Sequence, residues 1–500
     1  MVEPPHAVNG SGRGWTPRLV VSTLFMALVL EALGLGATMI AIGLPSILQE
    51  FPTTQGGWLT TVYFLAGAVC APLLGKAADL YGKRRILMIT MLVSGAGALL
   101  CAIAPSFPVM VVGRTLQGVI LATLSLVPSL IRDVYPPRQA VLASTIVITG
   151  MGAFSLAAPL LIGWLIATGG FRGLFWFDAA WTIGLGVAIR FSSPESPLRS
   201  NARPDVLGGA LLAGGVLAVL LYVSMGRTWG WLSVTGLLLL LGGAVLLTFF
   251  VRHARRAPEP IVRLELFRRK PLQFVAIAGA TGYAISASTF QLIPMLAMTP
   301  REAGGTYGLG LTTVQYATIE TPKALASVAA GLLLGFLVAR GRHPRLFLTM
   351  GLVGWAIGTA LLALRNDTFG DLILGAIVVG VGGGFTVAAV PNLVMRATPA
   401  GDQGSTAGTV QLCQTGFASV LPVVMFAVLA PYATVFPEGG VVYAEQGFRT
   451  WLLISTALAV LVVVAGLTVL RERRGEEVAE FTVDGPPVAA PVPPVETPKV

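Results

Sequence analysis

The sequence consists mainly of apolar runs of about twenty residues, separated by short polar or basic loops. A helix needs about 20 predominantly apolar residues to cross the hydrocarbon core of a bilayer, because each residue advances it by only about 1.5 Å. The pattern therefore predicts an all-α membrane protein with about 14 transmembrane helices. We expect the spans near residues 19–43, 57–75, 86–104, 108–131, 141–167, 173–189, 206–224, 231–251, 271–297, 311–339, 346–364, 371–394, 406–430 and 449–470.

Composition excludes most other classes of protein. The chain is 55% hydrophobic and 11% charged, with a mean hydropathy of +0.80, whereas a soluble domain carries about 25% charged residues. The net charge of +10 does not indicate a nucleic-acid partner, because the basic residues lie in short loops and form no basic face interleaved with aromatic residues.

Catalytic and cofactor chemistry is not expected either. The three cysteines fall within apolar runs, and the three histidines fall in the first tail and in loops, which disfavours a metal centre or a disulfide framework. The G-x-x-x-x-G-K-[ST] pattern of direct ATP users is absent. We therefore predict a non-enzyme with no cofactor and no metal.

Lysine and arginine placement predicts the orientation. Most of the 33 basic residues fall in loops on the same side as the N-terminus, and cytoplasmic loops carry this excess. We expect a multi-pass protein of the inner (cytoplasmic) cell membrane with both termini in the cytoplasm. The first helix is too long for a cleavable signal, so we expect it to be retained.

An internal repeat predicts two related halves. Val127-Pro128 and Pro159 recur, in order and at the same offset, as Val390-Pro391 and Pro422. We expect an N-terminal cytoplasmic tail at 1–18, a six-helix bundle at 19–189, two linker transmembrane helices at 206–251, a basic cytoplasmic loop at 252–270, a second six-helix bundle at 271–470 and a disordered cytoplasmic tail at 471–500.

The loop between the second and third spans carries the sharpest motif, GKAADLYGKRR. Its glycines permit a tight turn and a close helix approach, and its basic cluster marks the cytoplasmic side. An acid at the helix end is stabilised by an adjacent helix N-terminus. The simpler alternative is that the basic residues only set the topology. The positions concerned are Gly75, Asp79, Gly82, Lys83, Arg84 and Arg85.

Two more motifs lie in the fourth and fifth spans. The fourth-span motif contains Arg114, Gln117 and Gly118, and an arginine inside a span is costly unless it faces protein or water and has a partner. The fifth-span motif contains the four positions Gly150, Gly152, Pro159 and Gly163.

Together these three motifs resemble those of the major facilitator superfamily, and the two extra spans resemble its fourteen-spanner drug:proton antiporter branch. The resemblance covers residues 19–470 and implies a major facilitator fold, a conformational role for the loop motif, and export. It also implies that the partner of Asp79 is the N-terminus of the helix at 406–430, for which Ser405 is a candidate N-cap.

The chain departs from that branch in the first span. The branch usually has L-D-x-T-I-V-N-V-A-L-P, and here the Asp is replaced by Gly36 and the Asn by Ala41. The first-span acid is Glu31 instead, which lies about 140° around the helix from position 36 and is not a simple replacement. The fifth-span motif also departs from G-P-x-x-G-G, at Ala158 and Ile162.

Charged residues within spans are the candidate coupling sites, because their burial in lipid is costly. We predict that Glu31 and Arg114 form a proton-coupling pair, with a static ion pair as the alternative. Glu320 and Lys323 are i,i+3 neighbours on one helix face, and they form either a substrate or proton site or a self-compensated structural pair. Asp178 lies near the outer end of its span, where we expect a hydrated, interfacial position.

Polar and aromatic residues within spans are weaker candidates. Packing is the more common role of an aromatic side chain in a span. We predict as cavity lining Tyr63, Phe154, Tyr283, Gln291, Gln411 and Gln414.

The leading functional hypothesis is proton-coupled efflux of hydrophobic or amphiphilic molecules, as in antibiotic resistance, by a monomer whose partners are its substrate, protons and the lipid bilayer. One alternative is a dedicated exporter of an endogenous metabolite, lipid or natural product. The other is a membrane receptor or scaffold that retains the fold without transport.

Overall fold

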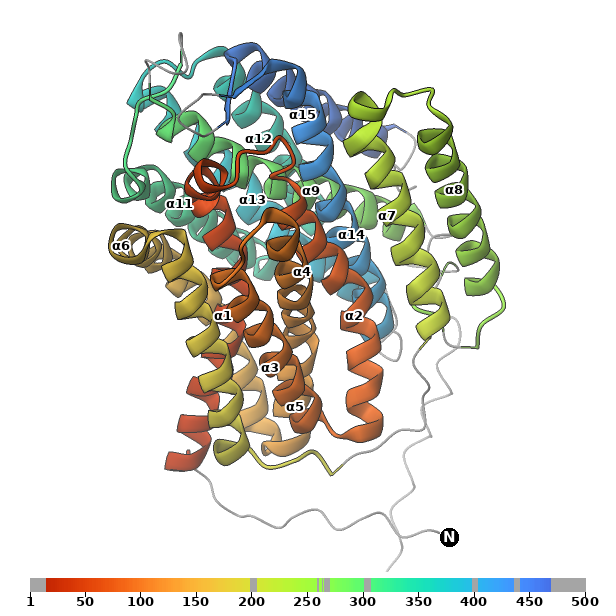
Figure 1. Cartoon of the computed structure of the whole chain (residues 1–500). Helices are drawn as coiled ribbons and strands as arrows, with labels where there is room; N and C mark the ends of the chain where they lie inside the picture. The colour runs from red at the N-terminus through yellow and green to blue at the C-terminus, as the bar shows by residue number, and fades with distance from the viewer. Residues whose placement is uncertain are drawn as a thin grey trace, which may run out of the picture.

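The computed structural model describes residues 15–197, 205–258, 260–262, 264, 270–300, 307–397, 403–435 and 441–468. The tails expected at 1–18 and 471–500 fall largely or wholly outside the described residues, as does part of the basic loop at 252–270. The described chain is almost entirely helical, and most of its helices run side by side (Figure 1). This confirms the predicted all-α class of membrane protein.

The helices follow the apolar runs closely. In the first part of the chain they are α1 (Pro17–Glu50), α2 (Trp58–Tyr81), α3 (Lys83–Ala102), α4 (Phe107–Gln117), the 3-10 turn η1 (Gly118–Ala122), α5 (Thr123–Val134) and α6 (Pro137–Ser192). The rest are α7 (Val206–Trp229), α8 (Val234–Ala254), α9 (Lys270–Met298), α11 (Thr313–Ala339), α12 (Pro344–Leu364), α13 (Phe369–Ala397), α14 (Gln403–Leu429), the 3-10 turn η3 (Ala430–Tyr432) and α15 (Glu445–Leu467).

Twelve helical segments of the described chain are long and apolar enough to cross a membrane. They include one segment of α6, at 158–192, and they do not include α9. Helix α6 is two helices joined at Gly170, whose φ of 60° and ψ of −169° are not helical. The break falls between the spans expected at 141–167 and 173–189, and the count of fourteen stays a prediction.

A short antiparallel hairpin was missed by the sequence analysis. Strands β1 (Ala433–Val435) and β2 (Val441–Tyr443) pair in the register Ala433↔Tyr443. The Tyr307 hydroxyl donates a hydrogen bond to the backbone carbonyl of Tyr443, which ties the segment before α11 to this hairpin. The hairpin marks one end of the bundle, called here the hairpin end, and the end that carries Lys83 is called the basic end.

The apolar core is divided unequally between these two ends. At the hairpin end, one cluster contains residues of both halves, such as Leu44 and Phe175 with Leu296 and Phe448. At the basic end there are two separate clusters, one formed only by residues 26–189 and the other only by residues 274–462. The halves therefore share a core at the hairpin end and pack separately at the basic end.

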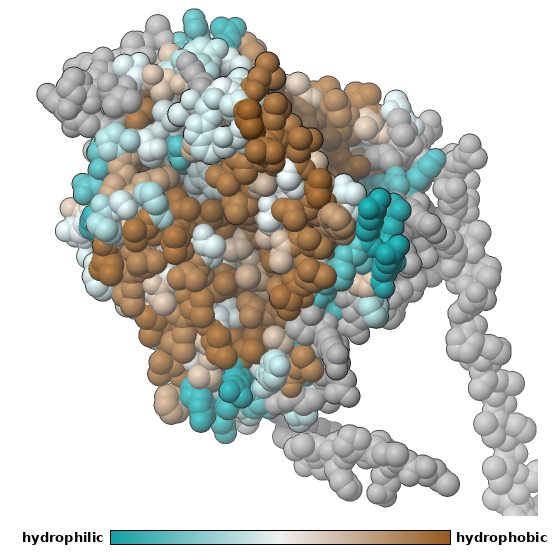
Figure 2. Space-filling view, turned by 45° about the vertical axis from the view of Figure 1, so that its right-hand side comes forward, coloured by the Kyte–Doolittle hydropathy of each residue, from teal (hydrophilic) through white to brown (hydrophobic). Residues whose placement is uncertain are grey.

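The molecular surface has the distribution that a bilayer requires. In Figure 2 a broad hydrophobic belt crosses the molecule, and hydrophilic residues gather above and below it. Many large apolar side chains on the outside of the helices are exposed, such as Leu238 and Leu241 on α8. Such a continuous apolar surface is expected where lipid tails replace water as the solvent.

The two linker helices lie at the side of the bundle (Figure 1). Helix α7 packs on α8 and also contacts α2 and α14. Asp205 caps α7 by accepting a hydrogen bond from the Gly208 N–H at 2.8 Å, and it also bonds the His253 ring at 2.8 Å and the Ile261 N–H at 3.2 Å. Partial burial favours the neutral acid, but these hydrogen bonds outweigh that effect and lower the pKa of Asp205.

Candidate functional site

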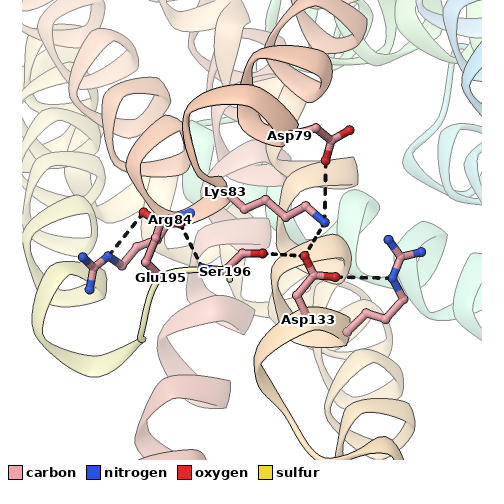
Figure 3. Close-up of polar contacts among 7 residues, drawn as sticks. Asp79, Lys83, Arg84, Asp133, Glu195 and Ser196 are labelled. Atoms are coloured by element: carbon pink, nitrogen blue, oxygen red, sulfur yellow. Dashed lines mark hydrogen bonds and ion pairs between the residues drawn. The ribbon is translucent and has the colours of Figure 1, made fainter. Parts of the chain in front are cut away.

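The loop motif at the basic end organises a cluster of charges (Figure 3). Lys83 Nζ lies 3.6 Å from Asp79 and 2.5 Å from Asp133 at the end of α5. The Ser196 hydroxyl donates to the same Asp133 oxygen at 2.7 Å. Lys83 and Asp133 are buried while Asp79 is 44% exposed at its side chain. The cluster therefore ties α2, α3, α5 and the segment after α6 into one unit.

Glu195 caps the start of α3 in the same cluster. Its carboxylate accepts hydrogen bonds from the backbone N–H groups of Arg84 at 2.9 Å and Arg85 at 3.1 Å. The Arg84 side chain in turn donates to the Ser193 carbonyl at 2.9 Å. A carboxylate at a helix N-terminus satisfies otherwise unpaired N–H groups and interacts favourably with the helix dipole. This cap was not anticipated, because Glu195 lies more than one hundred residues from α3 in sequence.

Two details of the loop motif differ from expectation. Gly82 makes the tight turn with a φ of 113°, a conformation that favours glycine. Around Gly75, however, an added Cβ would meet nothing within 4 Å, so no close helix approach occurs there. Asp79 pairs with Lys83. Helix α14, whose N-terminus was the expected partner of Asp79, begins at Gln403, so Ser405 lies within the helix and the expectation that it is the N-cap was wrong.

Arg114 lies fully buried in the first half and does not form the expected ion pair with Glu31. Its Nε donates to the Leu59 carbonyl at 3.2 Å and its Nη2 donates to the Gly36 carbonyl at 3.2 Å. The guanidinium carbon is 4.3 Å from the centroid of the Tyr63 ring. Among the described residues, no carboxylate lies within salt-bridge distance of Arg114.

The reason is the geometry of α1. Arg114 meets α1 at Gly36, and Glu31 is five residues earlier, about 7.5 Å along the axis and about 140° around it. Glu31 is 5% exposed, and within the described chain no side-chain hydrogen bond or ion pair is found for it. The predicted pairing is therefore not present in this structure, and the coupling role of Glu31 stays a prediction.

Gln117 connects Arg114 to a different acid. Arg114 Nη1 donates to Gln117 Oε1 at 2.9 Å, and Gln117 Nε2 donates to Asp178 Oδ2 at 2.7 Å. Asp178 is 2% exposed, so the expected hydrated, interfacial position was wrong. Its side chain faces the helix bundle and not the surface. An added Cβ at Gly118 would collide with the backbone of Tyr63, which explains the glycine beside this site.

Glu320 and Lys323 form the predicted pair in the second half. Lys323 Nζ lies 2.6 Å from Glu320 Oε1, and their side chains are 8% and 6% exposed. The Tyr316 hydroxyl donates to the other Glu320 oxygen at 2.8 Å, and the ammonium lies 4.0 Å from the centroid of the Phe290 ring. These partners belong to α9 and α11, and α13 packs against Lys323 at Gly380.

The candidate cavity residues do not gather around one described pocket. Gln291 and Gln414 are buried, each with one amide atom that has no hydrogen-bond partner, while Tyr283 and Gln411 are half-buried. The Phe154 side chain lies outside the described residues. The pocket found beside Trp58 at the hairpin end has a volume of only about 20 Å³, far below the roughly 300–1,000 Å³ of typical ligand sites, and none of these candidates lines it.

The fifth-span motif lies where α6 meets the other half of the molecule. An added Cβ at Gly163 would lie 3.2 Å from Val314 on α11, and Pro159 is a buried residue of α6. Gly163 thus permits close packing between the two halves. Gly150 and Gly152 also lie on α6, but their surroundings are outside the part of the chain that the structure describes.

Comparison with known families decides the identity of the fold. The model of the family described as Major Facilitator Superfamily matches residues 24–422. The chain belongs to the Major Facilitator Superfamily. It is therefore a multi-pass membrane protein of a transporter family, and not of an enzyme family.

Three relatives show the range within the superfamily. An uncharacterised MFS-type transporter of Mycobacterium tuberculosis is 26% identical over 80% of this chain and 58% of its own length, so the chain spans under two thirds of that relative. The probable actinorhodin transporter of Streptomyces coelicolor is 26% identical over 77% of this chain and 68% of its own. Multidrug resistance protein Stp of M. tuberculosis is 26% identical over 82% of this chain and 78% of its own length.

Solved structures agree on the fold. A bacterial homologue of the human lysosomal transporter Spinster, in an inward-facing and unoccupied conformation, aligns with a TM-score of 0.64. The alignment covers 90% of this chain and 96% of that one at 13% sequence identity. A peptide transporter of the POT family in complex with sulfate aligns with a TM-score of 0.63 at 15% identity, over 92% of this chain and 96% of that one.

Proposed function

We propose that the protein exports hydrophobic or amphiphilic small molecules in exchange for protons, by alternating access between two six-helix halves. The observation that carries the proposal is the division of the core: one cluster joins both halves at the hairpin end, while the basic end has a separate cluster in each half. Rigid halves that separate at one end and meet at the other are what rocking around a central site requires.

The orientation follows from the charge distribution. We assign the basic end to the cytoplasm because it carries the lysine and arginine excess. With this assignment the conformation opens towards the cytoplasm, both termini are cytoplasmic, and the chain crosses the inner membrane fourteen times. The exposure of Asp79 agrees with this assignment, because the pairing of Asp79 with the N-terminus of α14 is expected only when the basic end is closed.

Coupling to protons requires a carboxylate that changes its protonation state as the conformation changes. Apart from Asp133 in the charge cluster at the basic end, three carboxylates within the helices of the described chain are buried: Glu31, Asp178 and Glu320. A buried acid binds and releases protons differently when its access to water changes. The protein thus has candidate proton sites in both halves, which supports antiport.

The substrate class is inferred from the relatives and from the composition of the helices. The relatives are named for multidrug resistance and for actinorhodin transport, and a further one is the Tetracenomycin C resistance and export protein of Streptomyces glaucescens. The actinorhodin and Tetracenomycin C relatives favour a second candidate function, the dedicated export of a natural product. The loss of the branch's acid at Gly36 supports that candidate too.

Cells that lack their own exporters provide the test. We expect expression of the chain to lower the accumulation of cationic amphiphilic dyes, and a protonophore to abolish that effect. Unchanged accumulation across cationic, neutral and anionic dyes would reject broad export and favour the dedicated exporter. Binding by the purified protein without any flux in liposomes would instead support the receptor alternative.

A further inference from the structure

The environment of Arg114 poses a problem of charge compensation. Arg114 is 0% exposed, and its contacts with α1 and α2 are two backbone carbonyls and an aromatic ring. All of these groups are neutral. A buried cation is strongly unfavourable unless a negative charge offsets it, so the compensating charge must come from another direction.

Gln117 supplies the connection to that charge. Arginine can only donate hydrogen bonds and a carboxylate can only accept them, so the amide must present its oxygen to Arg114 and its nitrogen to Asp178. The distances of 2.9 and 2.7 Å fit this arrangement. The three side chains are 0%, 1% and 2% exposed. They form one dry Arg–Gln–Asp relay between α4 and the second half of α6.

The relay explains why the first helix needs no acid at position 36. An added Cβ on Gly36 would lie 3.2 Å from the Tyr63 hydroxyl oxygen, so the tyrosine occupies the side of Arg114 from which an acid on α1 would approach. Helix α1 contributes only the Gly36 carbonyl. The negative charge has moved from α1 to Asp178 on α6.

One oxygen of this acid is available for a proton. Asp178 Oδ1 is buried and has no hydrogen-bond partner in the described structure, while Oδ2 accepts from Gln117. Among the described residues, the titratable groups that face the relay are Tyr63 on α2 and Cys101 on α3, and Cys101 Sγ lies 3.7 Å from Gln117 Oε1. These neighbours do not add a second negative charge at neutral pH.

We infer that Asp178 is the proton-binding carboxylate of the first half, joined to Arg114 through Gln117, in place of Glu31; this rests on the proposed proton-coupled export. A proton taken from water forms an O–H bond at Oδ1 and neutralises the carboxylate. Arg114 then remains as an uncompensated buried cation, so this state is favoured only where the relay opens to water. Loss of that access to water expels the same proton.

Asp178→Asn tests the inference in proteoliposomes, because asparagine keeps the size of the side chain and an oxygen that accepts from Gln117. A cationic amphiphilic dye serves as the probe. We expect dye transport driven by a pH gradient to be lost while dye counterflow, which needs no proton, is retained. Glu31→Gln distinguishes the two candidate acids of the first half, because an assignment of the proton to Asp178 predicts that pH-driven dye transport survives this substitution.

The possible results distinguish a failure of proton-coupled export from a failure of the assignment to Asp178. Dye flux without proton movement in the wild type would refute proton-coupled export itself. Proton coupling in the wild type that persists in Asp178→Asn, or disappears in Glu31→Gln alone, would overturn the assignment to Asp178.

A second variant covers the case in which Asp178→Asn fails to accumulate. The double substitution Gln117→Glu with Asp178→Asn moves the carboxylate beside Arg114 and keeps the net charge. We expect it to restore the protein level and to couple dye flux to protons with a shifted pH midpoint. A midpoint equal to that of the wild type would contradict the inference, because the titrating group would then not belong to the relay.

Discussion

Removing one charge of the Glu320–Lys323 pair should destabilise the protein far more than removing both. Their 2.6 Å separation and low exposure mean that Glu320→Gln leaves a buried ammonium without its countercharge. The Tyr316 hydroxyl can still donate to the glutamine oxygen, so the loss is mainly one of charge. Loss of one partner of a buried pair costs about 3–5 kcal/mol. We expect a loss of that size in the free energy of unfolding.

The double substitution Glu320→Gln with Lys323→Met serves as the decisive comparison. It removes both charges and keeps similar volumes, which for buried pairs is often close to neutral. We therefore expect the double variant to recover most of the loss, with a coupling energy of up to about 3 kcal/mol between the two sites. The assay is equilibrium unfolding in mixed micelles, followed by tryptophan fluorescence.

Two results would refute this reasoning. Single variants that each cost under about 1 kcal/mol would show that the pair is solvated or loosely held. Additive losses in the double variant would show that the two side chains do not interact. The same proteins also decide between the two roles of the pair: if the double variant folds and still transports, Glu320 and Lys323 are structural.

Three further predictions concern positions outside this pair. Gly384→Ala on α13 would press a methyl group against the Ser327 backbone and should lower the free energy of unfolding by about 1–3 kcal/mol. Gly408→Ala is the control, because a methyl group at that position meets nothing within 4 Å and should not destabilise the protein. Equal losses in the two variants would contradict this prediction. Glu195→Ala should cost about 0.5–2 kcal/mol and speed amide exchange at the start of α3, and unchanged exchange there would argue against the cap. The pKa of Asp205 is lowered, so the Asp205 carboxylate contributes fully to the free energy of unfolding above about pH 4, and that contribution is lost as pH falls through the folded-state pKa. The stability difference between the wild type and Asp205→Asn should therefore shrink in acid. A difference that stays constant with pH would disprove this role of Asp205.

Much of the fold could be predicted from the sequence, because lipid imposes a simple rule on every helix. Apolar length and basic loops located the helices to within a few residues in most cases, for example 271–297 against Lys270–Met298 for α9. The break in α6 was also anticipated, since Gly170 interrupts two apolar runs. The β1–β2 hairpin was missed because its strands are only three residues long and show no recognisable alternation.

The candidate site was predicted only where it is local. Glu320 and Lys323 are three residues apart on one helix, so their spacing alone brings them together. The partners of Arg114 depend on how α1, α4 and α6 are rotated relative to one another, which their nearly uniform hydrophobicity does not encode. For that reason Glu31 was expected beside Arg114, and Asp178 was expected at the surface.

The most direct test of proton-coupled export is to monitor protons in proteoliposomes under an imposed pH gradient while cationic, neutral and anionic amphiphiles are added in turn. The account predicts that at least one class of amphiphile, most readily the cationic, releases protons in a saturable manner that requires the protein. A protein that moves these compounds across the membrane with no accompanying change in the gradient would contradict it.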